Sequence, residues 1–186
     1  VIYFETPANP KLDIIDIEKI SKLAKKYDIK VIVDNTFATP YFQKPLDLGV
    51  DVVVHSATKY IGGHGDTVAG VAIANDKEYI HKLKFEYMAE YGGVLSPFNA
   101  WLLNRGLKTL ALRMKKHEEN AIAVANFLKS SPKVDKVFFP GFEDNKDFPI
   151  VEKQMNGYGA MISFELKEGI EKTEKFVNSL NLFQLA

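Results

Sequence analysis

One lysine, Lys59, stands in the segment HSATKYIGGHGD between two hydroxyl residues and a run of glycines. A lysine amine forms a Schiff base with an aldehyde, as in enzymes that use a carbonyl cofactor. Ser56 and Thr58 lie three and one positions before the lysine, so their hydroxyls can hold a phosphate while the amine reaches the aldehyde. The glycines that follow let the loop pack close to such a ligand. This segment therefore predicts a site for a phosphorylated aldehyde.

Two further polar clusters follow apolar segments that we expect to be strands. Glu5–Pro10 (ETPANP) comes after the first segment, and Asp34-Asn35-Thr36 comes after the second. In open parallel sheets, ligands bind outside the carboxyl ends of the strands. We therefore expect both clusters and the lysine segment to converge on one crevice. This convergence is the main argument, because each cluster alone is weak evidence.

Pyridoxal phosphate is an aldehyde cofactor whose requirements these residue types meet. It needs a lysine for the Schiff base, which Lys59 provides, and an anion near its pyridine nitrogen, which Asp34 provides. Its phosphate needs hydroxyl and backbone N–H donors, and Ser56 and Thr58 carry the hydroxyls. Asn9 is a suitable donor for the phenolate oxygen of the ring. The three clusters together thus predict this cofactor.

Each of these residues also has an ordinary structural explanation. A lysine is most often a solvated surface residue, and an aspartate at a strand end often caps a turn. An asparagine between prolines is a common turn residue, and serines and threonines commonly cap helices. These explanations stay open for every candidate taken singly: Lys59, Asp34, Asn9, Ser56 and Thr58.

Composition and motif spacing exclude several other kinds of protein. The 24 basic residues balance 24 acidic ones, so charge gives no case for nucleic acid or an anionic membrane as a partner. The chain has no cysteine, which excludes disulfides and thiolate chemistry, and no apolar run approaches the length of a membrane span. His64 and Asp66 lack a third ligand at a suitable spacing, so we expect no metal site. The glycines at 62–65 are not a dinucleotide-binding fingerprint.

The pattern of apolar residues predicts an α/β fold with a mostly parallel sheet. Apolar residues recur at helical spacing over 16–27, between two apolar runs at 1–5 and 30–33, and this order is typical of a parallel βαβ unit. Strands that are apolar throughout indicate a sheet covered on both faces. Ser96-Pro97 is a strong helix start, and this helix is expected to reach about residue 128 with a break near Gly106. The other expected elements are strands at 51–55, 68–74, 134–139 and 160–166, and helices at 76–91 and 169–180.

The 186 residues and the hydrophobic content of 46% suffice for one large domain or one and a half small ones. The chain begins within an expected strand and stops on apolar residues, so we expect both ends to be cuts through a longer chain. The helix over 97–128 is expected to connect a first α/β domain to the start of a smaller second one.

Several segments together resemble the cysteine/methionine-metabolism family of PLP-dependent enzymes (the trans-sulfuration family), which has the aminotransferase fold type I. They are ETPANP (Glu5–Pro10), VDNTFATP (Val33–Pro40), SATKYIGGHGD (Ser56–Asp66), RGLKTLALRMKKHEENA (Arg105–Ala121), Pro140-Gly141 and GAMISFEL (Gly159–Leu166). The resemblance covers nearly the whole chain. It implies part of the PLP-binding large domain over 1–110, and a connecting helix with the start of the smaller C-terminal α+β domain over 111–186.

The resemblance also implies a role for each candidate residue. Lys59 would be the Schiff-base lysine, and Asp34 would be the partner of the pyridine nitrogen. Ser56 and Thr58 would contact the phosphate, and Asn9 would lie near the phenolate oxygen or the substrate carboxylate. The implied partners are a small amino-acid substrate and further copies of the chain, in a cytoplasmic homotetramer built from dimers with shared sites.

Within the family, GHGD after the lysine, YGGVLSPFNAWLL (Tyr91–Leu103) and MISFEL look most like methionine γ-lyases. This likeness implies γ-elimination, in which L-methionine gives methanethiol, 2-oxobutanoate and ammonia. The freed Lys59 amine would remove the Cα proton, and Thr36 would support the site from behind. Cystathionine γ-lyases, cystathionine γ-synthases and O-acylhomoserine sulfhydrylases, the last two acting by γ-replacement, stay open as alternatives. A non-catalytic interaction subunit is disfavoured because Lys59 and Asp34 are both intact.

Chains of this family are considerably longer than this one. The additional parts normally carry a tyrosine that stacks on the cofactor ring, backbone donors to the phosphate, and an arginine that binds the substrate carboxylate. Arg105 and Arg113 are poor substitutes for that arginine, because both lie on the expected connecting helix. We therefore expect the 186 residues alone to be inactive.

Overall fold

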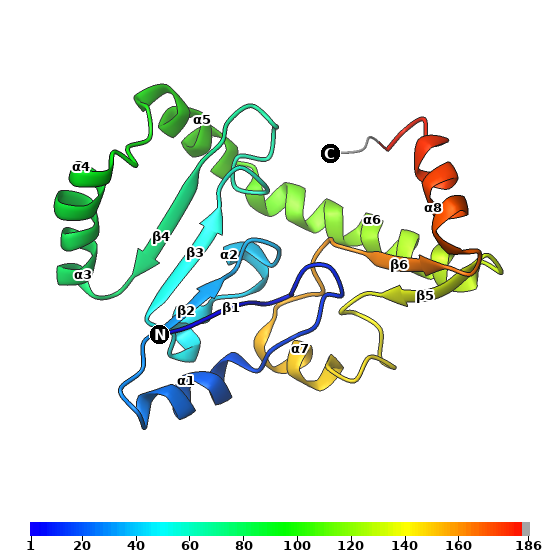
Figure 1. The fold of residues 1–186 in the computed structure, drawn as a ribbon, viewed down its shortest axis with the longest axis horizontal. Helices are drawn as coiled ribbons and strands as arrows, with labels where there is room; N and C mark the ends of the chain where they lie inside the picture. Colours follow the sequence, from blue (N-terminus) through cyan, green and yellow to red (C-terminus); the bar gives the residue numbers. More distant parts are fainter. Residues whose placement is uncertain (184–186) are drawn as a thin grey trace.

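The computed structural model describes residues 1–183, which form two β-sheets connected by a series of helical segments (Figure 1). The first sheet contains, in spatial order, β1 (Ile2–Glu5), β2 (Val31–Asp34), β3 (Val52–Ser56) and β4 (Gly70–Ala74). β1, β2 and β3 are parallel, and β4 is antiparallel to β3. The second sheet pairs β5 (Val134–Phe138) with β6 (Ser163–Leu166) in antiparallel fashion. The predicted α/β fold with a mostly parallel sheet is confirmed.

The helical segments are α1 (Ile17–Lys25), α2 (Thr39–Phe42), η1 (Pro45–Leu48), α3 (Lys77–Lys82), η2 (Leu83–Tyr87), α4 (Met88–Tyr91), α5 (Pro97–Leu107), α6 (Leu110–Ser130), α7 (Phe148–Gln154) and α8 (Gly169–Asn178). The predicted break near Gly106 is confirmed, because α5 ends before α6 begins. The predicted cap is also confirmed, since Oγ of Ser96 accepts a hydrogen bond from the N–H of Asn99 at 3.2 Å. α2, η1 and α7 were not predicted. Between residues 1 and 183, no helix combines the length and the apolar character needed to cross a bilayer.

The strand register gives the first sheet two different faces. Val31, Val33 and Val53 are buried against Ile17 and Ala24 of α1, so α1 covers one face. Because side chains alternate along a strand, the side chains between these valines belong to the opposite face.

The prediction of a sheet covered on both faces is wrong for parts of β1 and β4 in the described region. Tyr3 on β1 is 59% exposed, and β4 is exposed along most of its length. β4 lies at the edge of the sheet. The helix α1 packs against β2 and η1, so it does not cover β4. Within the described residues, these parts of β1 and β4 remain uncovered.

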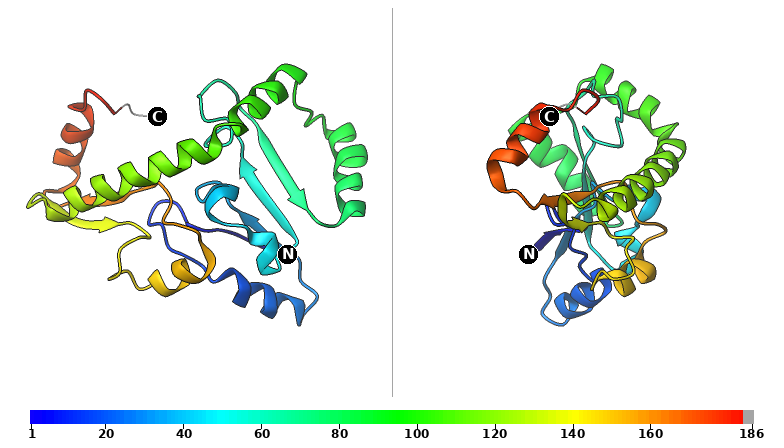
Figure 2. Two further views of the ribbon diagram at one scale, coloured as in Figure 1. Left: turned by 180° about the vertical axis from the view of Figure 1, so that it is seen from behind. Right: turned by 90° about the vertical axis from the view of Figure 1, so that its right-hand side faces the viewer.

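One hydrophobic core joins the first sheet region to the segment before β6. Phe42 of α2, Leu110 and Met114 of α6, and Val151 and Met155 at α7 are all buried in it. α6 runs from the first sheet to the second, and α7 lies beneath it beside the loop after β1 (Figures 1 and 2). Residues far apart in sequence thus support the carboxyl ends of the strands.

Candidate active site

The carboxyl ends of β1, β2 and β3 meet at one edge of the first sheet. Glu5 pairs with Asp34, and Asp34 pairs with Val54. Ser56 is two positions beyond Val54, so Asp34 and Ser56 lie on the same face, opposite α1. Lys59 follows in the turn directly after β3, and its side chain is exposed. The structure therefore brings three of the candidate residues to one end of one face.

Thr36 connects the ends of β2 and β3. Its hydroxyl donates to Oδ1 of Asp34 at 2.6 Å, and its N–H donates to the same oxygen at 2.9 Å. The hydroxyl oxygen of Thr36 also accepts a hydrogen bond from the N–H of Ser56 at 2.8 Å. Thr36 is buried, so these bonds are shielded from water. The Asp34 carboxylate is thereby held against the start of the lysine turn.

The second oxygen of Asp34 has a weaker partner. Oδ2 accepts a hydrogen bond from the hydroxyl of Tyr3 at 3.3 Å. Partial desolvation and then the neighbouring Asp34 carboxylate raise the pKa of Tyr3, so its hydroxyl remains a donor. Because a carboxylate oxygen has two lone pairs, Oδ2 can accept a further hydrogen bond from a ligand N–H. Tyr3 was not predicted as a site residue, and its only signal was the alternation along β1.

The two hydroxyls near Lys59 are held differently. Thr58 Oγ1 donates to the carbonyl of Ala69 at 3.2 Å and accepts from the N–H of Ala69 at 2.9 Å. The carbonyl of Ala69 also accepts a hydrogen bond from the N–H of Thr58 at 3.1 Å. The Thr58 hydroxyl can therefore rotate toward a bound anion, and the Ala69 carbonyl still keeps a partner. Ser56 is half-buried, and its carbonyl accepts from the N–H of Lys59 at 3.1 Å, which forms the turn.

Asn9 is the candidate that the structure leaves apart from the others. Its side chain is exposed, and its N–H donates to Oε2 of Glu5 at 3.3 Å. Among residues 1–183, no hydrogen bond joins the Asn9 side chain to another candidate residue. Its role at a phenolate oxygen thus remains a prediction from the resemblance.

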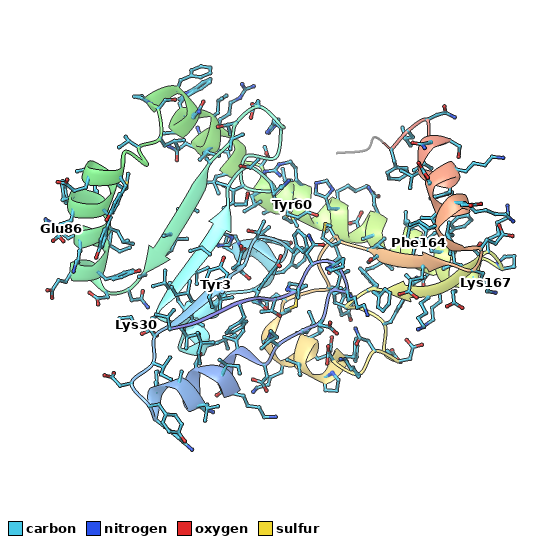
Figure 3. The ribbon with its side chains drawn as sticks, viewed as in Figure 1. Tyr3, Lys30, Tyr60, Glu86, Phe164 and Lys167 are labelled. Atoms are coloured by element: carbon cyan, nitrogen blue, oxygen red, sulfur yellow. The ribbon has the colours of Figure 1, made fainter. Side chains whose placement is uncertain are left out.

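Arg113 anchors the loop after β3 to α6 and was not predicted to do so. Nη1 donates to the carbonyl of Tyr60 at 2.8 Å, Nη2 donates to that of Gly106 at 3.0 Å, and Nε donates to Oγ1 of Thr109 at 3.1 Å. Figure 3 shows Tyr60 between the first sheet and α6. Gly63, with φ of +72°, leaves the space that the guanidinium fills. The helix pair α5–α6 therefore fixes the loop that follows the lysine.

Gly106 lets α5 touch this loop, and its replacement by alanine should destabilise the protein. A Cβ at this position would clash with the carbonyl oxygen of Gly62 and would lie 2.6 Å from that of Ile61. Alanine normally stabilises a helix by about 1 kcal/mol relative to glycine. We expect Gly106→Ala instead to lower the free energy of unfolding in urea by about 1–3 kcal/mol, as overpacking does. Gly93→Ala is the control, because no other atom would lie within 4 Å of a Cβ at that position.

His55 is buried on β3 and gives a pH-dependent prediction. It is 4% exposed, and its Nδ1 has no hydrogen-bond partner among residues 1–183. Burial lowers the pKa of His55 below its ordinary value of 6.5, although the Asp34 charge opposes this. The unfolded chain therefore binds a proton more readily than the folded one, and the stability due to neutral His55 is lost as pH falls below 6.5.

We expect His55→Gln to weaken the dependence of unfolding free energy on pH, compared between about pH 8 and about pH 5 by urea titration. His81→Gln, at an exposed position on α3, should retain the wild-type dependence. An unchanged slope in the His55 variant would contradict the prediction.

The residues present fit part of a pyridoxal phosphate site. An exposed amine, a carboxylate oxygen with a spare lone pair and a half-buried hydroxyl lie at one strand edge, which is the donor set this cofactor requires. The larger cavities lie elsewhere: one of about 500 Å³ includes Lys11 and Phe138, and one of about 570 Å³ includes Phe127 and Phe176. In the region from 1 to 183, no three His, Cys, Asp or Glu side chains are grouped as metal ligands. The described residues thus form one open wall of a site.

Comparison with known proteins identifies the family of this chain. Residues 1–186 match the family described as Cys/Met metabolism PLP-dependent enzyme. The chain is 50% identical over 185 residues to cystathionine beta-lyase of Lactococcus lactis subsp. cremoris, and 50% identical over 188 residues to L-methionine gamma-lyase of Fusobacterium nucleatum subsp. nucleatum. Both matches cover 100% of this chain, and they cover 48% and 47% of those relatives, respectively.

The fold also matches solved structures. The structure of cystathionine gamma-lyase from Lactobacillus plantarum, complexed with L-serine, is similar with a TM-score of 0.96 and 50% identity. The match covers 100% of this chain and 48% of that one. The chain therefore spans about half the length of the relatives it matches.

Proposed function

The chain belongs to the family of Cys/Met-metabolism PLP-dependent enzymes, and from this premise we propose that it carries the lysine-bearing part of an enzyme that cleaves a C–S bond in a sulfur amino acid. The observation that supports this proposal is the hydrogen-bonded series Asp34–Thr36–Ser56, with the exposed side chain of Lys59 in the next turn. A carboxylate, a hydroxyl and an amine held in this order are the groups that the cofactor of the family needs.

The proposed mechanism assigns one task to each residue. When bound, pyridoxal phosphate supplies an electron sink for negative charge at the substrate Cα. Lys59 would hold the cofactor through its amine, and this amine, when free, would accept the Cα proton of the substrate. Asp34 would accept a hydrogen bond from the pyridine N–H, and Oδ2 is the oxygen with spare capacity because Thr36 already occupies Oδ1 with two hydrogen bonds. The negative charge of Asp34 keeps that nitrogen protonated.

Three further residues bind the remaining polar groups of the cofactor in this proposal. Ser56 and Thr58 would donate hydroxyl hydrogen bonds to the phosphate, for which the Thr58 hydroxyl would turn away from Ala69. Asn9 would donate to the phenolate oxygen. Its exposed position on the loop after β1 leaves its side chain amide available for this contact.

The finer proposal is γ-elimination, with L-methionine as the substrate. The likeness to L-methionine gamma-lyase supports it, but cystathionine beta-lyase is equally similar at 50% identity. β-Elimination from cystathionine is therefore the second candidate. γ-Replacement on a homoserine ester is the third, and it requires an added thiol.

The carbon skeleton of the product separates the two elimination candidates. The full-length protein that contains these 186 residues, loaded with pyridoxal phosphate, is supplied with L-methionine or L-cystathionine, and the 2-oxoacids are identified by chromatography. Methionine γ-elimination gives 2-oxobutanoate and methanethiol, whereas cystathionine β-elimination gives pyruvate and homocysteine. Formation of 2-oxobutanoate from methionine supports the finer proposal, and pyruvate from cystathionine alone replaces it with the second candidate. No 2-oxoacid from either substrate would overturn C–S lyase activity.

We also propose that the protein acts as a homo-oligomer, as a tetramer of chains with shared sites. Several large aromatic side chains on and beside α4 and α5 are exposed: Tyr91 by 82%, Phe98 by 66% and Trp101 by 55%. Contiguous exposed apolar surface is typical of an interaction site. Light scattering of the purified protein measures the number of chains.

A further inference from the structure

A buried side-chain amide joins the ends of β1 and β2 immediately next to the candidate site. Nε2 of Gln43 donates to the carbonyl of Thr6 at 3.0 Å and to Oδ1 of Asn35 at 2.8 Å. Nδ2 of Asn35 donates in return to the carbonyl of Gln43 at 2.9 Å. Gln43 and Asn35 are each 1% exposed, and Thr6 is 0% exposed. Gln43 therefore fixes the distance between two strand ends from within the protein.

Gln154 of α7 closes this set of hydrogen bonds into a ring. Its Nε2 donates to Oε1 of Gln43 at 3.0 Å and to the carbonyl of Ile15 at 3.0 Å. Its Oε1 accepts from the N–H of Ile17 at 3.2 Å. The N–H of Ile15 donates to Oγ1 of Thr6 at 3.0 Å, which returns to the end of β1. All polar atoms of both glutamine side chains thus have partners.

The ring holds two loops that carry candidate cofactor contacts. Asn35 directly follows Asp34, and Thr6 begins the loop that leads to Asn9. Gln43 is fully enclosed, and the amide of Gln154 is occupied by Gln43, Ile15 and Ile17, so neither is suited to touch a ligand. In a buried polar network each lost bond leaves its partner unpaired, so the network favours a single arrangement of its members. The arrangement it favours includes the turn that orients the Asp34 carboxylate.

We propose that Gln43 is a positioning residue for cofactor binding, which sets Asp34 relative to the loop after β1, and that Gln154 acts through Gln43. This inference rests on the proposed function. It assigns to α7 a part in the site, although α7 contributes no residue to the strand edge.

The test compares two variants that keep side-chain length and remove the amide, Gln43→Met and Gln154→Met. Ser21→Ala is the matched control, because Ser21 of α1 is 2% exposed and its hydroxyl has no partner among residues 1–183. The apparent Kd for pyridoxal phosphate is measured by absorbance titration of each apoprotein, prepared as the full-length protein that contains these residues, together with its Tm. We expect Gln43→Met to raise Kd about tenfold, because the Thr6 carbonyl and Oδ1 of Asn35 lose their hydrogen-bond donor and the two loops are no longer held in place. Gln154→Met should raise Kd less, and Ser21→Ala should leave it unchanged.

A purely structural role would give a different result. The Tm of both variants would fall, while Kd for pyridoxal phosphate and the absorption spectrum of the bound cofactor would stay within about twofold of wild type, and this outcome would overturn the inference. If Gln43→Met does not fold, Gln154→Met at the half-buried position provides the test, and its Kd and cofactor spectrum are compared with its Tm in the same way. A wild-type protein that binds no pyridoxal phosphate would instead refute the proposed function itself.

Discussion

Replacing Lys59 with alanine is expected to reduce 2-oxoacid formation by about 10³-fold or more, because the lost amine both holds the cofactor and moves the Cα proton. Initial rates with the substrate identified above give this value. Borohydride reduction of the wild-type protein with pyridoxal phosphate, followed by peptide mapping, should give an adduct confined to Lys59. The variant should give no adduct at this peptide.

Two further variants separate chemistry from charge. Lys59→Arg keeps the positive charge, but its guanidinium stays protonated and does not form a Schiff base, so its activity should be as low as that of the alanine variant. Lys77→Ala, at an exposed lysine of α3, should keep wild-type activity. Substantial turnover by Lys59→Arg would show that the lysine acts only as a cation, contrary to the proposed mechanism.

Replacing Asp34 with asparagine should lower kcat by about 10²-fold, the scale observed when one preorganised electrostatic contact to developing charge is removed. Asparagine can still accept hydrogen bonds from Thr36 through its Oδ1, so the turn after β2 is preserved. It carries no negative charge, and the pyridine nitrogen of the cofactor therefore loses its protonated form. The measurements are kcat and the absorption spectrum of the bound cofactor.

Asp47→Asn is the control for this variant, since Asp47 is an exposed aspartate on η1. It should not change either measurement. If Asp34→Asn keeps both its spectrum and its kcat, Asp34 serves only to cap the turn, which is the ordinary structural explanation for this residue.

The elements with strong local signals were predicted from the sequence. The helix start at Ser96-Pro97 depends on a cap and a proline, and α1 depends on apolar spacing, so neighbouring residues alone identify them. The placement of Asp34 and Ser56 at one edge of the sheet was predicted because each follows an apolar strand, and the carboxyl ends of parallel strands lie at the same edge. These features could be predicted because a few adjacent residues determine them.

The features that sequence reasoning missed depend on residues distant in the chain. α7 is short and has no clear apolar repeat. It is held by packing with Phe42 and Met114 in the shared core and by the hydrogen bond from its own Gln154 to Gln43. Arg113 is an ordinary helical residue until the loop after β3 lies against it. Single-sequence patterns contain no signal for such contacts.

The hydrogen-bonded ring has a consequence for the order of folding. Its bond between Gln154 and Ile15 joins residues 139 positions apart, and its bond between Gln154 and Gln43 joins residues 111 positions apart. Contacts of such long sequence separation form slowly, because a large chain loop must close first. The strand edge with Asp34 and Lys59 should therefore become competent for the cofactor only after α7 has docked. In a refolding experiment, recovery of cofactor absorbance would lag behind recovery of helical circular dichroism.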